Sequence, residues 1–199
     1  MLSSRLIRLA ILVFALATGS LAQTSTQPSA LGRTAIAVDD TFLQKEFGTE
    51  FKLETKYPAL VADFDGDGVA DIAIAARAKN PMVDESEHDY KVLDPYYGFY
   101  GTGDPKITTS FGSDDPEQKG LVVCIIHGSG TAAWHADQPK AKFVIVNLPF
   151  KQVTVKRIQI KKKKVNAIYA EESSAVQESS VIFFDGKKYK YQPMGTDLH

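Results

Sequence analysis

Cysteine is almost absent from this sequence, because Cys124 is the only one among 199 residues. A single thiol cannot form an intrachain disulfide, which excludes the class of small secreted domains that disulfides hold together. Cys124 lies inside the apolar run LVVCII, residues 121–126, and this position predicts a buried, unreactive thiol. The fold must therefore be stabilised by its hydrophobic core, with a bound metal as a further possible source of stability.

Long apolar segments are also missing. The apolar run Leu9–Ala17 is shorter than the ~20 residues that a membrane-spanning helix needs. Arg5 and Arg8 precede this run and Ser20-Leu21-Ala22 follows it, which is the pattern of a secretory signal peptide. We expect cleavage near Ala22 and a secreted or periplasmic location. The next residue is Gln23 rather than cysteine, so a lipid anchor is not expected.

Neither sign of charge is in large excess. Once residues 1–22 are removed, 177 residues remain with 21 basic and 24 acidic side chains, a net charge of −3. So small a net charge favours neither nucleic acid nor an anionic membrane as a partner. The length fits one domain of ordinary size. We expect a disordered leader at 23–38, rich in Ser, Thr, Gln and Pro, and a single domain at 39–199.

Strand patterns dominate that domain. The exception near its start is residues 39–48, where an aspartate cap, Gly48 and apolar residues at helical spacing predict a short helix. Short apolar, β-branched runs predict strands at 59–62, 72–76, 121–126, 143–147, 153–160, 165–170, 181–184 and 189–191. Asp185-Gly186 predicts a hairpin turn between the last two. The expected fold class is mainly β (α+β is possible): a small antiparallel domain with one or two short helices.

Four aspartates crowd between two apolar segments in the stretch LVADFDGDGVADIAIA, residues 60–75. Their spacing is D-x-D-x-D-G-x-x-D, formed by Asp63, Asp65, Asp67 and Asp71. Alternate positions of a tight loop direct carboxylates at one centre, and the Val69 carbonyl can add a backbone oxygen. Such a set suits Ca²⁺, which prefers six to eight oxygen ligands, better than Mg²⁺, which tends to keep its own waters. The sequence therefore predicts a calcium site.

The loop is not an EF-hand, because its twelfth position is Ile74, where an EF-hand needs glutamate. It resembles the calcium loop of FG-GAP and VCBS repeats, in which a DFDGDGxxDI motif lies in a hairpin between two strands. The resemblance covers residues 60–76 only. It implies Ca²⁺ at the aspartates but not a propeller, which needs at least about four blades. The alternative is an acidic turn whose aspartates cap backbone groups.

A second motif, HGSG at 127–130, follows the apolar run 121–126. It is similar to the oxyanion loop of α/β-hydrolases, but the G-x-S-x-G elbow that such enzymes need is missing. The other interpretation is a turn that ends a buried strand, with Trp134 packing back on the core. We favour this second interpretation.

Three segments are less specific. Residues 94–105 gather Tyr96, Tyr97, Phe99 and Tyr100, which could bind a sugar or a protein but fit better as rings folded over the sheet. Lysines at 161–164 fit a solvated edge and turn, with contact to an anionic polymer as the alternative. The acidic run 84–89 fits a solvated loop.

Together these observations predict a secreted or periplasmic, non-enzymatic binding or structural module with a calcium loop. Its partner would be a protein or glycan outside the cytoplasm, not nucleic acid. The alternative is a small secreted hydrolase that uses the loop His127–Gly130.

Overall fold

The computed structural model describes residues 37–106, 111, 115–172 and 178–194. Contacts divide the chain into Met1–Ala35 and Ile36–His199, and the described residues all belong to the second unit. The predicted signal peptide and nearly all of the predicted leader lie outside the described residues. None of the helices in the described part is both long enough and apolar enough to cross a membrane.

The predicted short helix is confirmed as α1, Asp40–Phe47. It begins where the Asp39 carboxylate accepts a hydrogen bond from the Phe42 N–H at 2.8 Å, and it ends at Gly48, whose φ of 99° disfavours other residues. Phe42, Leu43 and Phe47 share its buried face. Two further helical turns, α2 at Pro95–Phe99 and the 3-10 turn η1 at Gly130–Ala132, were not predicted.

The first sheet has six strands: β1 Phe51–Leu53, β2 Leu60–Ala62, β3 Asp71–Ala78, β4 Lys91–Leu93, β5 Leu121–His127 and β6 Ala141–Ile145. Its order is β1-β3-β5-β6-β4, and β2 also pairs with β3. All pairs are antiparallel except β4 with β6. Strands β1 and β2 pair with opposite ends of β3, and the connection from β2 to β3 is a hairpin loop.

The second sheet is an antiparallel meander of four strands: β7 Gln152–Ile160, β8 Lys163–Glu171, β9 Ser179–Phe184 and β10 Tyr189–Pro193. The turn between β9 and β10 contains Gly186 at φ 100°, and the Asp185 carboxylate accepts from the Lys187 and Lys188 N–H groups. This confirms the hairpin predicted from Asp185-Gly186.

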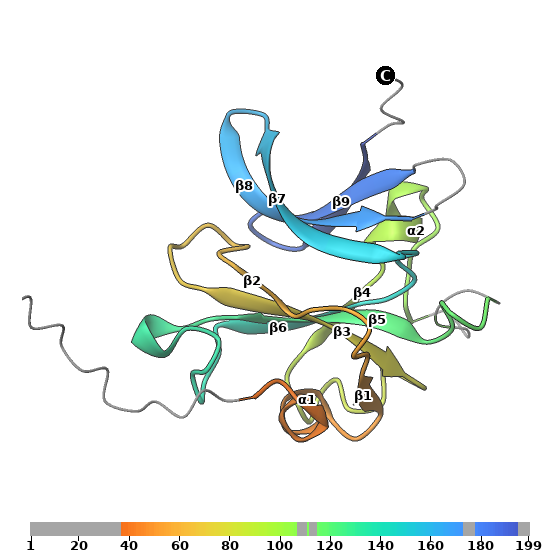
Figure 1. Cartoon of the computed structure of the whole chain (residues 1–199), viewed down its shortest axis with the longest axis vertical. Helices are drawn as coiled ribbons and strands as arrows, with labels where there is room; N and C mark the ends of the chain where they lie inside the picture. The colour runs from red at the N-terminus through yellow and green to blue at the C-terminus, as the bar shows by residue number, and fades with distance from the viewer. Residues whose placement is uncertain (1–36, 107–110, 112–114, 173–177, 195–199) are drawn as a thin grey trace, which may run out of the picture. The chain divides into compact units, whose positions relative to one another are not determined.

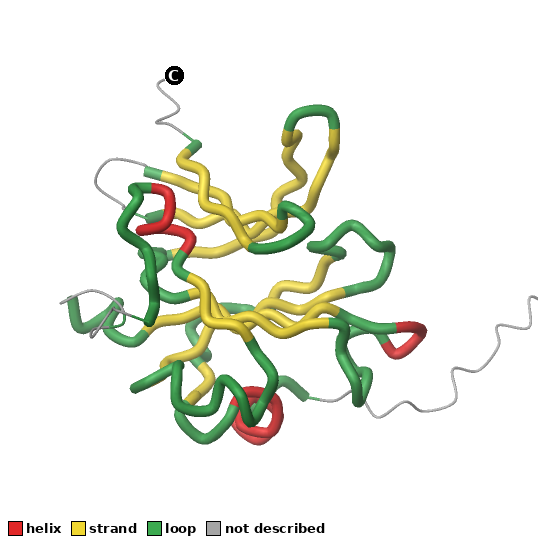
Figure 2. Tube along the Cα trace, turned by 180° about the vertical axis from the view of Figure 1, so that it is seen from behind, coloured by secondary structure: helices red, strands yellow, loops and turns green. Residues whose placement is uncertain are grey.

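Two hydrophobic clusters cover the two faces of the first sheet. One face carries Ala73, Val123 and Ile125, which pack in one cluster with Ile168 and Ile182 of the second sheet. The other face carries Ile72, Val122, Cys124 and Val144 and packs against α1. Strands β3 and β5 are buried on both sides for this reason, and the thiol of Cys124 is buried as predicted. Figures 1 and 2 show the two sheets as layers, with α1 on the side of the first sheet away from the second.

The predicted fold class is confirmed: the domain is mainly β, mostly antiparallel, with two short α-helices. Each of the eight predicted strands corresponds to a strand of the structure. Strands β1 and β4, each three residues long, were missed, since so short a segment shows no periodicity.

Candidate metal centre

The aspartate motif forms the loop between β2 and β3, two adjacent antiparallel strands. Asp63 follows the end of β2, and Asp71 is the first residue of β3, opposite Ala62. The hairpin setting implied by the resemblance to FG-GAP loops is thus present. The loop lies beside the start of the turn after β5, because the Gly128 N–H donates to the Asp71 carboxylate.

Three of the four carboxylates meet. Asp63, Asp65 and Asp71 each offer an oxygen, and these oxygens lie within 4.8 Å of one another. Opposed ligands of a Ca²⁺ ion with bonds of ~2.3–2.6 Å are about 5 Å apart, so the three oxygens fit around one ion. Within the described residues no other group of three acidic, histidine or cysteine side chains gathers in this way. The acidic run 84–89 is therefore not a second such cluster.

Asp71 is the buried anchor of the loop. Its Oδ2 accepts from the N–H groups of Phe64 at 2.7 Å and Asp65 at 3.3 Å, and its Oδ1 accepts from Gly128 N–H at 2.8 Å. Burial raises the pKa of this carboxyl to about 6, although the backbone donors act in the opposite direction. A bound cation would favour the ionised form.

Asp63 organises the exposed part of the loop. Its Oδ1 accepts from Gly66 N–H at 2.7 Å and Asp67 N–H at 3.1 Å, and its Oδ2 accepts from Gly68 N–H at 2.9 Å. Gly66 and Gly68 have φ of 79° and 87°, a left-handed conformation that side chains resist. These bonds are the backbone caps of the acidic-turn alternative. They also aim the carboxylate inward, as a metal site requires.

Lys140 supplies the positive charge that faces the loop. Its ammonium donates to Asp65 Oδ2 at 2.6 Å and to Asp67 Oδ2 at 2.7 Å. This bond lowers the pKa of Asp67, while the same two carboxylates raise the pKa of Lys140. Asp67 also accepts from the Val69 N–H at 2.8 Å, and its carboxylate is outside the group of three. Ligation by Asp67 and by the Val69 carbonyl remains a prediction.

His127 connects the loop to the second sheet. The ring is buried, its Nε2 lies 2.7 Å from the Tyr189 hydroxyl, and its Nδ1 lies 3.5 Å from Asp65 Oδ2. Burial lowers the pKa of the ring, which favours the neutral form. The Asn166 amide of β8 also reaches the loop and donates to the Asp63 carbonyl at 2.8 Å. The two sheets thus meet beside the aspartates.

The HGSG segment is a turn that closes β5. Ser129 N–H donates to the Ala133 carbonyl at 3.0 Å, and a Cβ on Gly128 would clash with the Ala70 carbonyl oxygen. Trp134 packs edge-on against Phe42 at 5.8 Å between ring centroids, as the turn interpretation predicted. The ring of His127 contacts Tyr189 and Asp65 rather than a serine hydroxyl.

The aromatic segment 94–105 is only partly folded over the sheet. Tyr96 packs against the core between the sheets, but Tyr97, Phe99 and Tyr100 are 44%, 52% and 58% exposed. Phe99 and Tyr100 nevertheless contact Tyr191 of β10, at 5.5 and 6.4 Å between ring centroids, so the prediction that these rings cover a sheet holds in part.

Sequence reasoning missed several partners of the loop, namely Gly128, Lys140, Asn166 and Tyr189. They lie 57 to 103 residues from their loop contacts, or reach the loop through His127, and no local pattern marks them. Comparisons of the chain with protein-family models, with curated proteins and with solved structures found no match.

Proposed function

We propose that this chain is a non-enzymatic binding or structural protein that works outside the cytoplasm and whose β2–β3 loop binds one Ca²⁺. The ligands would be the carboxylates of Asp63, Asp65, Asp67 and Asp71 with the Val69 carbonyl. The observation that supports this best is the approach of three carboxylate oxygens to within 4.8 Å, in a loop whose backbone N–H groups hold them in place.

A calcium ion would supply the charge that this arrangement lacks. Like charges at such distances repel, and among the described residues only the Lys140 ammonium offsets them, at the Asp65 and Asp67 oxygens. Asp71 belongs to β3 and accepts from the residue after β5, Asp65 faces His127, and the Asp63 carbonyl accepts from Asn166 of β8. An ion held by these aspartates would therefore cross-link a hairpin that already touches both sheets. This arrangement supports a structural role for the ion.

The hydrolase alternative receives less support. The imidazole of His127 is 1% exposed and lies against the Tyr189 hydroxyl, so a substrate carbonyl has no direct approach to it. Ser129 belongs to the turn after β5, and its N–H is bound to Ala133.

Thermal unfolding in EDTA and in excess calcium tests the proposal. A ligand at tenfold excess over Kd stabilises the folded state by about 1.4 kcal/mol, which raises Tm by roughly 3–6 °C in a domain of this size. Asp63→Asn should abolish that rise, since it removes a charged ligand but keeps a side-chain acceptor for the turn. Asp185→Asn is the matched control, because Asp185 caps a turn on β9–β10 in the same way.

Equal melting curves with EDTA and with calcium would refute the metal site. The aspartates would then serve as backbone caps and as partners of Lys140 only.

Export is tested separately. We expect the soluble chain to begin near Gln23 after cleavage at Ala22, which mass spectrometry of the intact protein measures. An unprocessed Met1 on soluble cytoplasmic protein would contradict the proposed location and leave the calcium experiment unaffected.

A further inference from the structure

The far end of the β7–β8 hairpin is separated from the rest of the second sheet. Strand β9 pairs with β8 only from Ile168 to Glu171, so residues 156–167 form a two-stranded ribbon beyond the sheet. Figure 1 shows this hairpin extending past β9. The base of the ribbon contacts the domain, since Asn166 donates to the Asp63 carbonyl and Ala167 is buried. The two-stranded part beyond them gains little stability by itself, and its length therefore needs a reason other than the core.

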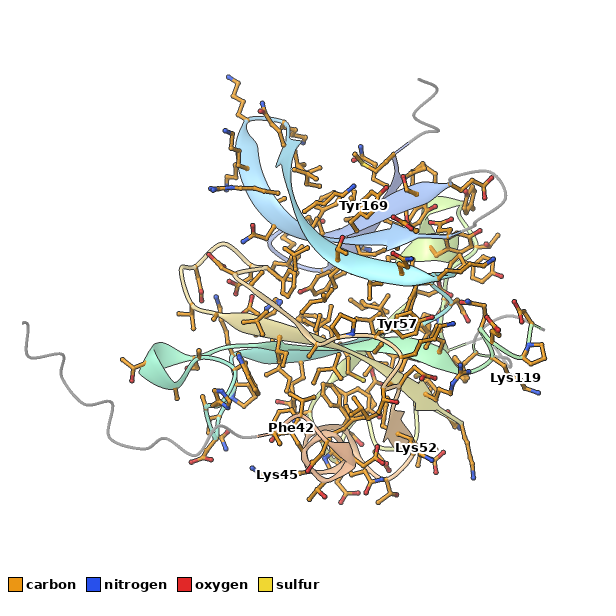
Figure 3. All side chains as sticks on the ribbon, in the orientation of Figure 1. Phe42, Lys45, Lys52, Tyr57, Lys119 and Tyr169 are labelled. Carbon is orange, nitrogen blue, oxygen red and sulfur yellow. The ribbon has the colours of Figure 1, made fainter. Side chains whose placement is uncertain are left out.

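Positive charge is concentrated on this ribbon. Residues 156–164 contain six basic side chains and no acidic one: Lys156, Arg157, Lys161, Lys162, Lys163 and Lys164. The chain as a whole has a net charge of −1, so the remainder carries −7. All six side chains are exposed, and within the described residues none forms an ion pair. The near-zero net charge of the chain therefore results from a strongly basic ribbon and an acidic remainder. Figure 3 shows nitrogen-tipped side chains projecting from the free end of the hairpin.

Protection of a sheet edge accounts for only part of this arrangement. Lysines on an edge strand discourage pairing with other chains, and this explains Lys156 and Arg157 on β7. Lys163 and Lys164 lie on the part of β8 that β9 does not pair with, so edge protection applies to them too, whereas Lys161 and Lys162 form the turn, where it does not. Lys161 has φ of 55°, a left-handed conformation that glycine or asparagine adopts with less strain.

Three aliphatic side chains share one face of the ribbon with Lys156 and Lys163, whereas Arg157 and Lys164 lie on the opposite face. Ile158 is directly opposite Val165, and Ile160 is opposite Lys163, so all three aliphatic residues point to the side of the hairpin that faces away from the first sheet. Each is half-buried, and none belongs to either hydrophobic cluster of the domain. Nearer the body of the sheet, the same face carries Tyr169, with the Lys156 ammonium 3.2 Å from its ring centroid.

From these features we propose that the distal β7–β8 hairpin docks on an anionic lipid surface, with its ammonium groups among the headgroups and Ile158, Ile160 and Val165 in the interfacial region. A polybasic segment is attracted to anionic lipid, and a few aliphatic side chains add the second contribution that reversible anchoring needs. A soluble anionic polymer would use the charges but would have no use for the aliphatic face. The inference does not depend on calcium binding.

Vesicle sedimentation in EDTA tests the docking. The full chain is mixed either with vesicles of pure phosphatidylcholine or with vesicles that also contain ~30% phosphatidylglycerol. The second kind mimics a moderately anionic surface. The measured quantity is the partition coefficient on anionic vesicles divided by that on pure phosphatidylcholine. Any contribution of the apolar N-terminal segment that is the same for both kinds of vesicle cancels in this ratio. Each basic residue near an anionic surface contributes about fivefold, so replacing Lys161–Lys164 by glutamine should lower the ratio by at least ~100-fold.

The matched control replaces four exposed lysines elsewhere, Lys45, Lys52, Lys91 and Lys119, by glutamine. It changes the net charge by the same amount and should leave most of the ratio intact. An Ile160→Trp variant places an indole on the aliphatic face, and lipids brominated on their acyl chains should quench its emission in anionic vesicles. Circular dichroism melting of each variant verifies that the fold is retained.

Three results would overturn the proposal. The first is a ratio near one for the unmutated chain at low salt. The second is an equal loss of binding in the two quadruple variants, which would indicate a dependence on total charge alone. The third is capture by dextran sulfate as strong as by anionic vesicles, together with an unquenched indole, which would indicate a soluble polyanion as partner instead.

Discussion

At the scale of single residues, the loop between β2 and β3 is organised by carboxylates that accept backbone N–H groups. Asp63 and Asp71 each accept three such bonds, and these six bonds fix the path of the chain from Phe64 to Gly68 and its contact with Gly128. Capping and metal binding do not exclude each other, because a carboxylate oxygen has more than one lone pair. Capping and metal binding can be distinguished only by a substitution or condition that removes one of these roles and keeps the other.

Asp71→Ala should destabilise the calcium-free protein by about 2–4 kcal/mol. The substitution leaves the N–H groups of Phe64 and Gly128 buried without an acceptor, and each such loss costs about 1–3 kcal/mol. Urea unfolding in EDTA measures the change. Asp67→Ala is the comparison, since that side chain is 30% exposed and water can replace its bonds. A loss below about 1 kcal/mol for Asp71→Ala would show that the loop adjusts to supply other acceptors.

At the scale of elements, a charged network holds the edge strand β1 beside β3. Arg77 of β3 donates from Nε to Glu54, the residue after β1, at 2.7 Å. Its two terminal nitrogens donate to the carbonyls of Lys119 and Glu117 at 2.7 and 2.8 Å. A strand of three residues forms few ladder bonds, so the guanidinium adds a link between β1, β3 and the approach to β5.

This pair should make part of the stability depend on pH. The hydrogen bond from Arg77 holds the pKa of Glu54 below its ordinary value, so the folded state favours the ionised form. The associated stability is fully present above the unfolded pKa of about 4.3 and is lost as pH falls through the lower folded pKa.

Glu54→Gln should therefore reduce the fall in unfolding free energy between about pH 5 and pH 3, measured by urea unfolding at each pH. The effect should be below ~1 kcal/mol, because Arg77 is 37% exposed and solvent screens the pair. Glu50→Gln, outside this network, serves as control. An unchanged pH profile in Glu54→Gln would mean that the pair adds no stability.

At the scale of the whole domain, from Ile36 onward, stability depends on the layer between the two sheets. Phe143 of β6 is buried there, 5.3 Å from Tyr189, 5.7 Å from Phe184 and 5.1 Å from His127, as measured between ring centroids. His127, a member of the same aromatic group, lies beside Asp65, with 3.5 Å between its Nδ1 and Asp65 Oδ2. Packing between the sheets and the geometry of the loop are thus parts of one structure.

Phe143→Ala should cost about 3–5 kcal/mol, because it removes a buried ring and leaves a cavity between the sheets. Chemical denaturation measures the loss. Tyr100→Ala removes a ring of similar size that is 58% exposed, and it should cost less than about 1 kcal/mol. Similar losses in both variants would contradict the assignment of the core to this layer.

The sequence by itself determined the features that depend on neighbouring residues. The aspartate cap and apolar spacing defined α1, β-branched runs defined eight strands, and Asp185-Gly186 defined the last hairpin. The loop at 63–71 was also found, because its turn is made by its own aspartates and glycines. Each of these follows from local periodicity or turn chemistry, which acts over a few residues.

The tertiary structure alone decided what surrounds the loop. Lys140 reaches Asp65 from 75 residues away, and Asn166 reaches Asp63 from 103. The tertiary structure also leaves the end of the β7–β8 hairpin unpaired with β9, so the run of lysines lies on a separate, charged ribbon. Such contacts depend on how two sheets pack, and packing selects partners by shape and burial across the whole chain, a property that no short segment encodes.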